Sequence, residues 1–477
     1  MIGIAVLFVI LAFLALVLIR TLMFTPKEQP ECSQESVALN PDAVISALSE
    51  LVRCKTVSHH DPTMEDEAEF RKLIEKLPGL YPHVYEACTL RELPGRALLF
   101  RWPGKSQEEP AVLMAHYDVV PVNEENWEKP PFEAILEGDV LWGRGTLDTK
   151  VTVNGVLFAA NQLIAQGFQP ERDIYFAFSG GEEVSGPGAV SVVDLFREEG
   201  ITPGLVVDEG GAVVEDVFPG VKGPIGLIGI AEKGMIDAQF RCMSAGGHAS
   251  APKPHTPVGI LAKAATRVEG NPFPPHMVGP AALMFDTLGR HSSFLYRMIF
   301  ANMWCFGWVI DLLGKTSGGE MNALLRTTVA FTQMSGSSAP NVIPPEAKMV
   351  ANMRLNPADS VASALDYLRR TVKDPQIEIS ALDSSEPSRV SRVDCDAWEK
   401  VAASVAETWQ GSIVAPYLMV QCSDSRHWGA LSDKVYRFSA MDLTAQERAT
   451  IHGNNERIRV STACKAVEFY IRLMKKC

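Results

Sequence analysis

The sequence lacks the usual marks of a disulfide-rich secreted protein and of a cysteine zinc site. Its 477 residues contain no N-x-S/T sequon and no C-x-x-C pair, and the nine cysteines are odd in number and scattered. Spaced cysteine pairs are expected both of disulfide-rich secreted proteins and of zinc sites built from cysteines. Basic residues are also too few to balance the acidic ones, and the net charge of −13 argues against non-specific binding to nucleic acid. We therefore expect no nucleic-acid partner and mostly inert thiols.

The N-terminal segment carries no charge from Ile2 to Ile19, and Arg20 is the first charged residue. An apolar run of this length is about enough to span a bilayer. No basic residue precedes it and no A-x-A-like site follows it, whereas a cleaved signal peptide usually has both. We expect residues 1–24 to be a single-pass membrane anchor, with a cleaved signal of a secreted protein as the alternative. Arg20 and Lys27 weakly favour a cytoplasmic body.

The remaining chain is too long for one compact core, and its pattern changes along the sequence. Residues 25–39 are polar and irregular, which predicts a linker. From residue 40, short apolar runs such as AVLMAHYDVV and DIYFAFSG alternate with helical patterns, which predicts an α/β domain with a mostly parallel sheet. Residues 234–384 give the order β-α-β-β-α-β, typical of a small α+β unit. We predict that this unit interrupts an α/β domain formed by residues 40–233 and 385–477.

One stretch of the inserted unit, residues 293–314, is strongly apolar. Arg297 and Asp311 leave an uncharged core between them that is too short to span a bilayer. It predicts either a buried helical hairpin or an apolar wall that faces a lipid-like substrate or a membrane surface.

Five potential metal ligands each lie in a distinctive segment. His116 is in AHYDVVP, Asp148 in GRGTLDTK, Glu183 in SGGEEVSG, Asp208 in LVVDEGG and His452 in TIHGNNE. Imidazole and carboxylate are the side chains that Zn²⁺ accepts in hydrolytic sites, with one position left open for water. Several of these segments directly follow predicted strands, where open α/β sheets place their ligand sites. The sequence therefore predicts a metal-dependent site.

These segments resemble those of the zinc-dependent peptidase and amidohydrolase family that includes carboxypeptidase S, aminoacylase, carnosinase and succinyl-diaminopimelate desuccinylase. From about residue 40 onward the chain is most similar to the carboxypeptidase S branch, which also holds N-fatty-acyl-amino-acid synthase/hydrolase. The resemblance implies two Zn²⁺ ions per chain and an inserted lid or dimerisation domain, so a homodimer is one option. It implies that His116 and Asp208 bind one zinc, that Glu183 and His452 bind the other, and that Asp148 bridges them.

The resemblance also implies catalytic roles. Glu182 would act as general base toward a zinc-bridging hydroxide, and His248 would stabilise the oxyanion, often in the active site of the other subunit. Asp118 lies two residues after His116, so that both side chains point the same way on an extended segment, and it can fix the tautomer of the imidazole. Two residues match positions that grip a substrate carboxylate, Asn341 and Arg354.

We therefore expect a zinc metallopeptidase or N-acyl-amino-acid amidohydrolase that cleaves an amide next to a free carboxylate. The substrate is either a small peptide or an N-acyl amino acid, and the apolar stretch 293–314 slightly favours a long acyl group. The alternatives are a hydrolase restricted to dipeptides and a non-catalytic binding protein that retains the fold. The loop QCSDSRHW (421–428) departs from the family's Gly-Gly-Thr-Asp or Gly-Asn-Thr-Asp type, which leaves the substrate open.

Overall fold

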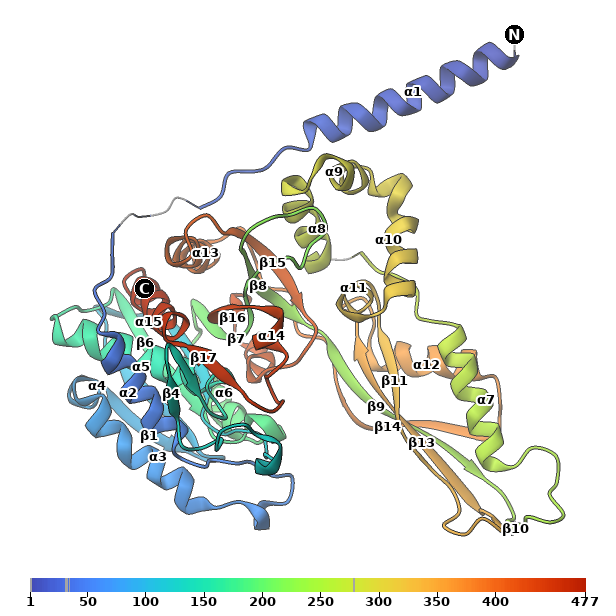
Figure 1. Cartoon of the computed structure of the whole chain (residues 1–477), viewed down its shortest axis with the longest axis horizontal. Helices are drawn as coiled ribbons and strands as arrows, with labels where there is room; N and C mark the ends of the chain where they lie inside the picture. The colour runs from blue at the N-terminus through green and yellow to red at the C-terminus, as the bar shows by residue number, and fades with distance from the viewer. Residues whose placement is uncertain (1, 31–32, 34, 278) are drawn as a thin grey trace.

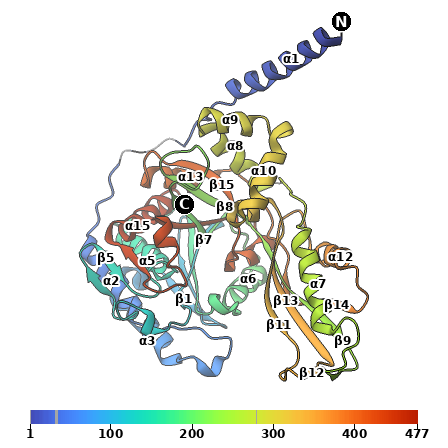
Figure 2. The same cartoon turned by 45° about the vertical axis from the view of Figure 1, so that its right-hand side comes forward.

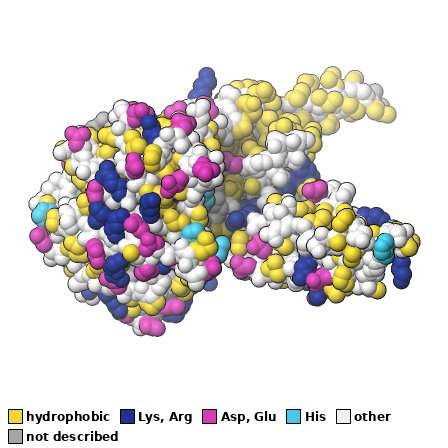
Figure 3. Space-filling view, turned by 60° about the horizontal axis from the view of Figure 1, so that its bottom comes forward, with side chains coloured by type: hydrophobic (Ala, Val, Ile, Leu, Met, Phe, Trp, Pro, Cys, Tyr) yellow, Lys and Arg dark blue, Asp and Glu magenta, His cyan; other side chains and the backbone are white. Residues whose placement is uncertain are grey.

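The computed structural model describes residues 2–30, 33, 35–277 and 279–477. Met1 of the predicted anchor and residues 31–32 and 34 of the predicted linker lie outside the described residues. The chain forms a larger α/β domain and a smaller domain connected to it through β9 and β14, and a long N-terminal helix projects from the body (Figure 1). The surface is hollowed between the two domains (Figure 3).

The larger domain is built on a mixed eight-stranded sheet, in the order β1-β2-β6-β3-β7-β16-β8-β15. Parallel pairings join β6, β3, β7 and β16 and also pair β8 with β15. The pairings β1–β2, β2–β6 and β16–β8 are antiparallel. The prediction of a mostly parallel sheet is therefore right for β6, β3, β7 and β16 and for the pair β8–β15, but wrong for the antiparallel β1–β2–β6 edge and the β16–β8 pairing. The strands are β1 (Thr89–Leu93), β2 (Ala97–Trp102), β3 (Ser106–His116), β6 (Arg172–Ser179), β7 (Leu205–Val214), β8 (Ile225–Glu232), β15 (Ile413–Met419) and β16 (Val435–Leu443).

Alternate side chains of the central strands feed two separate cores, because successive residues of a strand point to opposite faces. In β6, Phe176 and Phe178 belong to the core under α2, α5, α13 and α15, whereas Tyr175 and Ala177 pack with α6 and η4. This two-sided burial explains why the strands are continuous apolar runs in the sequence. The covering elements are α2 (Pro41–Val52), α5 (Lys150–Ala165), α6 (Gly188–Glu198), α13 (Asp396–Thr408), η4 (Asp424–Ala430) and α15 (Val460–Met474).

The remaining elements of the larger domain border this sandwich. A three-stranded antiparallel sheet, in the order β17-β5-β4, lies beside the end of the chain that carries His452. These elements are α3 (Glu67–Leu80), α4 (Pro82–Ala87), β4 (Ile135–Glu137), β5 (Val140–Trp142), α14 (Ala445–Arg448) and β17 (Arg457–Arg459).

The smaller domain is an antiparallel sheet in the order β11-β13-β9-β14, with α7 and α12 on one face. Its main elements follow the order β-α-β-β-α-β that the sequence predicts. A short ladder between β10 and β12 lies at the end of this domain farthest from the larger one (Figures 1 and 2). The elements are β9 (Gly234–Met243), β10 (Gly247–His248), α7 (Pro257–Gly270), β11 (Thr328–Ser335), β12 (Val342–Ile343), β13 (Glu346–Leu355), α12 (Val361–Val372) and β14 (Ile377–Ser385).

Four helices inside the insertion pack on the larger domain instead of the smaller one. Met284 and Leu288 of α8 share a core with Ala415 and Leu418 of β15, so these helices cover the edge strand of the large sheet. The insertion at 234–384 is thus divided between both domains by its packing. The helices are α8 (Gly279–His291), α9 (Phe294–Ala301), α10 (Met303–Ser317) and α11 (Gly319–Leu325).

The apolar stretch 293–314 forms the hairpin of α9 and α10, which is only partly buried. Phe300 and Ile310 face the core of the larger domain, but Trp304 and Trp308 are exposed. The interpretation as a buried hairpin is therefore wrong for its outer face.

The N-terminal helix α1 (Ile2–Met23) is 22 residues long, almost wholly exposed, and long and apolar enough to cross a membrane. By the same test it could also be a signal sequence.

Candidate active site

The candidate site lies at the carboxyl ends of the central parallel strands. β3 ends at His116, and β6 is followed by the short 3₁₀ turn η3 (Glu182–Val184), which holds Glu182 and Glu183. Asp148 lies just before α5, and His452 lies in the turn before β17. Polar side chains gather here because an open α/β sheet leaves a crevice outside the strand ends.

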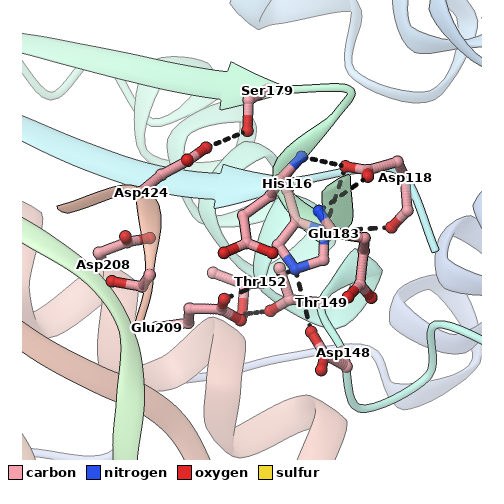
Figure 4. A network of polar contacts seen from close by, with 12 residues as sticks. His116, Asp118, Asp148, Thr149, Thr152, Ser179, Glu183, Asp208, Glu209 and Asp424 are labelled. Atoms are coloured by element: carbon pink, nitrogen blue, oxygen red, sulfur yellow. Dashed lines mark hydrogen bonds and ion pairs between the residues drawn. The ribbon is translucent and has the colours of Figure 1, made fainter. Parts of the chain in front are cut away.

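Asp148 is the centre of the cluster, since its two carboxylate oxygens face two different imidazoles. Oδ1 of Asp148 lies 3.0 Å from Nε2 of His116 (Figure 4), and Oδ2 lies 3.1 Å from Nε2 of His452. The same nitrogen of His452 is 3.0 Å from Oε2 of Glu183. The structure thus brings together four of the five ligands predicted from the sequence.

The carboxylate beside His116 belongs to Glu209 and not to Asp208, which the sequence analysis expected there. Oε1 of Glu209 lies 3.6 Å from Nε2 of His116. The buried Asp208 side chain is directed to the loop 421–428, where its Oδ2 accepts the backbone N–H of Ser425 at 2.9 Å. Neighbouring residues of a strand point to opposite sides, so only one of these two carboxylates can face His116. The structure therefore places Glu209, and not Asp208, beside His116.

A bulge in β7 turns Glu209 into the site. The ladder with β16 pairs Arg437 with Asp208 and Phe438 with Gly211, leaving Glu209 and Gly210 out of register. Gly210 has a φ of +145°, and a Cβ on Gly211 would lie 1.9 Å from the carbonyl oxygen of Leu227. The Gly-Gly pair of DEGG is therefore required by the backbone conformation that exposes Glu209.

Asp118 connects His116 to the turn that carries Glu182. Nδ1 of His116 lies 3.1 Å from the carbonyl oxygen of Asp118 and 3.4 Å from its Oδ1. The Asp118 carboxylate also accepts the backbone N–H groups of Glu182 at 3.1 Å and Glu183 at 3.2 Å, and the hydroxyl of Ser58 at 2.7 Å. This fully buried carboxylate therefore fixes the imidazole and the 3₁₀ turn relative to each other.

Burial makes the carboxylates of the cluster costly to ionise. It raises the pKa of Glu182 well above the ordinary value and raises the pKa of Glu209 to about 8. Burial acts the same way on Asp148, but hydrogen bonds with His116 and His452 outweigh it and hold the pKa of Asp148 well below its usual range. Hydrogen bonds with Asp148 and Glu183 raise the pKa of His452 to about 10. Bound cations would compensate this concentration of negative charge.

The donor set fits divalent metal ions. Ligand atoms of His116, Asp148 and Glu183 lie within 4.8 Å of one another, as do those of His116, Glu182 and Glu209. Oε1 of Glu183 is buried without a hydrogen-bond partner among the described residues, which is unusual for a carboxylate unless a ligand takes that oxygen. Imidazole nitrogen together with carboxylate oxygen is a donor set that Zn²⁺ accepts in hydrolytic sites.

A cavity of about 460 Å³ opens onto this cluster. Asp148, Glu182, Glu183, Glu209 and His452 line its polar end. The remaining wall is largely apolar and is formed by strands β7, β8, β15 and β16 with the neighbouring turns; it includes Leu147, Val214, Leu227, Tyr417, Met419, Met441, Leu443 and Ile451. A cavity of this kind can hold an apolar group next to reacting polar groups.

A second buried carboxylate, that of Glu456, holds the loop before Asp148. Glu456 is fully buried and forms an ion pair of 2.6 Å with Arg144. It also accepts the backbone N–H groups of Gly145 at 3.1 Å, Leu147 at 2.7 Å and Asp148 at 3.2 Å. Because Glu456 follows His452 by four residues, this network ties together the two loops that meet at Asp148.

The predicted residues of the smaller domain are not gathered at the cluster. The β10–β12 ladder pairs His248 with Val342, and the backbone N–H of Ala249 donates to the carbonyl of Asn341 at 2.9 Å. Both therefore lie near the β10–β12 ladder, at the end of the smaller domain farthest from the larger domain (Figure 1). Arg354 is closer, because its Nη1 contacts Sγ of Cys422 at 3.3 Å, and Cys422 lines the cavity.

Glu209 and Glu456 are the site residues that the sequence analysis missed. The signal for Glu209 was the second carboxylate of DEGG together with the two glycines that follow it. The signal for Glu456 was a carboxylate four residues after His452, in HGNNERI. Neither pattern specifies by itself which side chain faces the cavity.

Comparison with known proteins identifies the relatives of this chain. The model of "Peptidase family M20/M25/M40" matches residues 112–476. The probable carboxypeptidase S-like 2 of Dictyostelium discoideum is 32% identical, with 98% of this chain and 92% of that protein covered. The N-fatty-acyl-amino acid synthase/hydrolase of Xenopus tropicalis is 35% identical, covering 91% and 85%. A metallo-carboxypeptidase structure from Sulfolobus solfataricus superposes with a TM-score of 0.65 at 18% identity, covering 91% of this chain and 98% of that one.

Proposed function

Because the chain belongs to peptidase family M20/M25/M40, a family of metal-dependent hydrolases, we propose that it cleaves an amide bond next to a free carboxylate with two metal ions. The observation that carries this proposal is the position of Asp148, whose two oxygens face His116 on one side and His452 on the other. A single carboxylate between two imidazole ligands suits a bridge between two cations.

The proposed ligands form two sets that share Asp148. His116 and Glu209 would complete the first set, and Glu183 and His452 would complete the second. Glu209 replaces Asp208 in the first set because it is Glu209 that lies beside His116. Zn²⁺ is the proposed metal, since the donors are nitrogen and oxygen only and the family chemistry is hydrolytic. Two such ions supply Lewis acidity at the carbonyl and lower the pKa of a bound water.

Glu182 is the proposed general base. It lies in the cavity wall beside the cluster, and its raised pKa suits a group that takes up and returns a proton near neutral pH. Glu182 accepts a proton from water as the water oxygen bonds to the carbonyl carbon. It then delivers that proton to the amide nitrogen as the C–N bond breaks, which yields a carboxylic acid and an amine. Asp118 holds the backbone of Glu182 in place for this transfer.

The apolar part of the cavity wall favours an N-acyl amino acid with a long acyl group as the substrate. Side chains such as Val214, Leu227 and Leu443 can receive an acyl chain adjacent to the metal ligands. Arg354, at the domain boundary, is the proposed partner of the substrate carboxylate. The relatives carry both kinds of name, carboxypeptidase S-like and N-fatty-acyl-amino acid synthase/hydrolase, so a small peptide is the second candidate.

His248 and Asn341 would reach an active site in one of two ways. The smaller domain of one chain can close on its own larger domain, or the β10–β12 end can enter the site of a second chain in a homodimer.

Helix α1 is the proposed single-pass anchor, because nearly all of its apolar side chains are exposed. A cleaved signal is the alternative, and sequencing the N-terminus of the mature chain tests it.

The substrate is tested with a matched panel of N-acyl amino acids and dipeptides that share the same C-terminal residue. We expect kcat/KM to rise with acyl length up to the capacity of the cavity, and dipeptides to be turned over more slowly. Equal or faster turnover of the dipeptides would overturn the acyl preference while leaving the hydrolase intact. No turnover of either class by the metal-loaded chain would overturn the hydrolase itself.

A further inference from the structure

The hairpin of α9 and α10 presents a large apolar surface to solvent. Trp304, Trp308 and Leu312 follow one another at intervals of four residues, so they share one face of α10. Their exposed fractions are 56%, 66% and 51%. Leu295 on α9 is 63% exposed. Monomeric soluble proteins rarely expose clustered apolar side chains of this size, and such patches mark interaction surfaces.

This surface is continuous with helix α1. The Asn302 amide, at the turn between α9 and α10, donates to the carbonyl of Val17 at 3.1 Å and to Oγ1 of Thr21 at 3.2 Å. The ring of Phe13 packs edge-on against Trp304, with 5.8 Å between the ring centroids. Figure 3 shows hydrophobic side chains that gather where the N-terminal helix leaves the body. Any medium that surrounds the C-terminal half of α1 therefore also reaches the hairpin.

Charged groups lie at the margins of this surface, where Arg297 of α9 and Asp311 of α10 flank an uncharged run. The chain carries no Asp, Glu, Lys or Arg from Met298 to Ile310. Asp311, at the end of this run, is paired with Arg326 and Lys315. The Arg20 guanidinium donates to the carbonyl of Ala301 at 3.2 Å. Basic groups at the margin of an exposed apolar surface with two tryptophans match the arrangement found at a membrane–water interface.

We propose that the outer face of α9 and α10 is seated in the lipid bilayer beside α1, so that the catalytic body is held on the membrane by two elements. About 10 Å along the axis of α1 separate Phe13 from Arg20, at 1.5 Å per residue. If Arg20 marks the membrane boundary, Trp304 beside Phe13 lies below the headgroups. This inference rests on the proposed anchor, but it is independent of the proposed hydrolysis.

Seating the hairpin also sets the position of the catalytic cavity. Helix α11 follows α10 after Gly318, and Glu320 of α11 lines the cavity and lies 3.5 Å from Arg448. One wall of the cavity is therefore joined directly to the membrane-seated hairpin. A substrate with a long acyl chain, which partitions into lipid, would then be delivered close to the site.

The test uses the full chain in phosphatidylcholine vesicles with ordinary or brominated acyl chains, because bromine quenches tryptophan fluorescence only on close approach. We expect bromolipid to reduce the fluorescence of the wild-type chain by up to about a quarter, since two of its eight tryptophans face lipid. The double variant Trp304→Phe/Trp308→Phe should lose most of this reduction. Trp142→Phe, on a half-buried residue of the larger domain, should keep it.

Each outcome decides the proposal. A chain that floats with the vesicles but shows equal quenching with and without Trp304 and Trp308 overturns the seating and leaves the anchor. A chain that does not float overturns both. Absence of quenching together with self-association that the double variant abolishes assigns the surface to a second copy of the chain, and so overturns the lipid proposal. Hydrolysis of a short, soluble N-acyl amino acid, measured in parallel, reports separately on the reaction.

Discussion

Replacing Glu209 by Gln tests the proposed ligand set most sharply, because it keeps the size of the side chain and removes the charge. Glu209 lies 3.6 Å from His116 and Asp208 faces the loop 421–428, so the two neighbouring residues predict opposite results. We expect the Glu209→Gln variant to lose one of two bound metal ions. Asp208→Asn, the matched control, should keep both. Loss of a direct ligand should weaken binding by more than the roughly 10–100-fold that outer-shell changes cost.

The same substitution should stabilise the metal-free chain at alkaline pH. Burial raises the pKa of Glu209 from 4.5 to about 8, so the folded state binds its proton more tightly than the unfolded state does. The free energy of unfolding of the metal-free chain therefore falls as pH rises from 4.5 to about 8, and the loss is complete above that range. At about 1.4 kcal/mol per pKa unit the loss is on the order of a few kcal/mol, and Gln removes it.

Thermal unfolding of chelator-treated chains at pH 8.5, with and without added zinc, measures both effects. The Glu209→Gln variant should have a higher Tm than the wild-type chain without metal. It should show a smaller rise in Tm on zinc addition, because a ligand that binds more weakly stabilises the folded chain less. Wild-type zinc binding by Glu209→Gln, combined with zinc loss in Asp208→Asn, would refute the reasoning and restore Asp208 as the ligand.

Three further substitutions test other parts of the site. Glu182→Gln should retain the bound metal and lose roughly 10²–10⁴-fold in kcat, as expected for a proton-transfer group; a variant with full activity would remove Glu182 as the base. Glu456→Ala should lower the free energy of unfolding by roughly 3–5 kcal/mol, because it leaves the buried Arg144 without its ion-pair partner. It should also weaken metal binding. Denaturant unfolding that matches the wild type would contradict the structural role of Glu456. Arg354→Ala should raise KM for a substrate with a free carboxylate and leave KM unchanged for the corresponding amide. The control Arg369→Ala, on the exposed face of α12, should leave both KM values unchanged. Equal effects of Arg354→Ala on both substrates would exclude carboxylate recognition.

The centre of the main sheet and the grouping of most candidate site residues could be predicted from the sequence, because each depends on local patterns. Two-sided burial gives continuous apolar strands, and a parallel sheet brings the residues that follow them to one edge. His116 and Glu183 could be placed for this reason. The antiparallel β1–β2 edge could not, since a run such as ALLFRW looks the same in either direction of pairing.

The choice between Asp208 and Glu209 could not be made from the sequence, since it depends on a bulge. Two adjacent carboxylates on a strand point to opposite faces, and the register between β7 and β16 decides which one enters the cavity. The sequence also left open whether the α9–α10 hairpin is buried or forms an exposed apolar wall. Its residues are as apolar as a core segment, and the tertiary packing decides that Phe300 and Ile310 enter the core whereas Trp304 and Trp308 stay outside.

The metal content of the purified full chain tests the central claim most directly. After dialysis against metal-free buffer and reconstitution with Zn²⁺, elemental analysis should find about two zinc ions per chain, as expected of a two-metal hydrolytic site. Chelation should abolish hydrolysis of the N-acyl amino acid, and added zinc should restore it. A folded chain that binds no zinc even after reconstitution, or that hydrolyses its substrate equally well after complete chelation, would contradict the account.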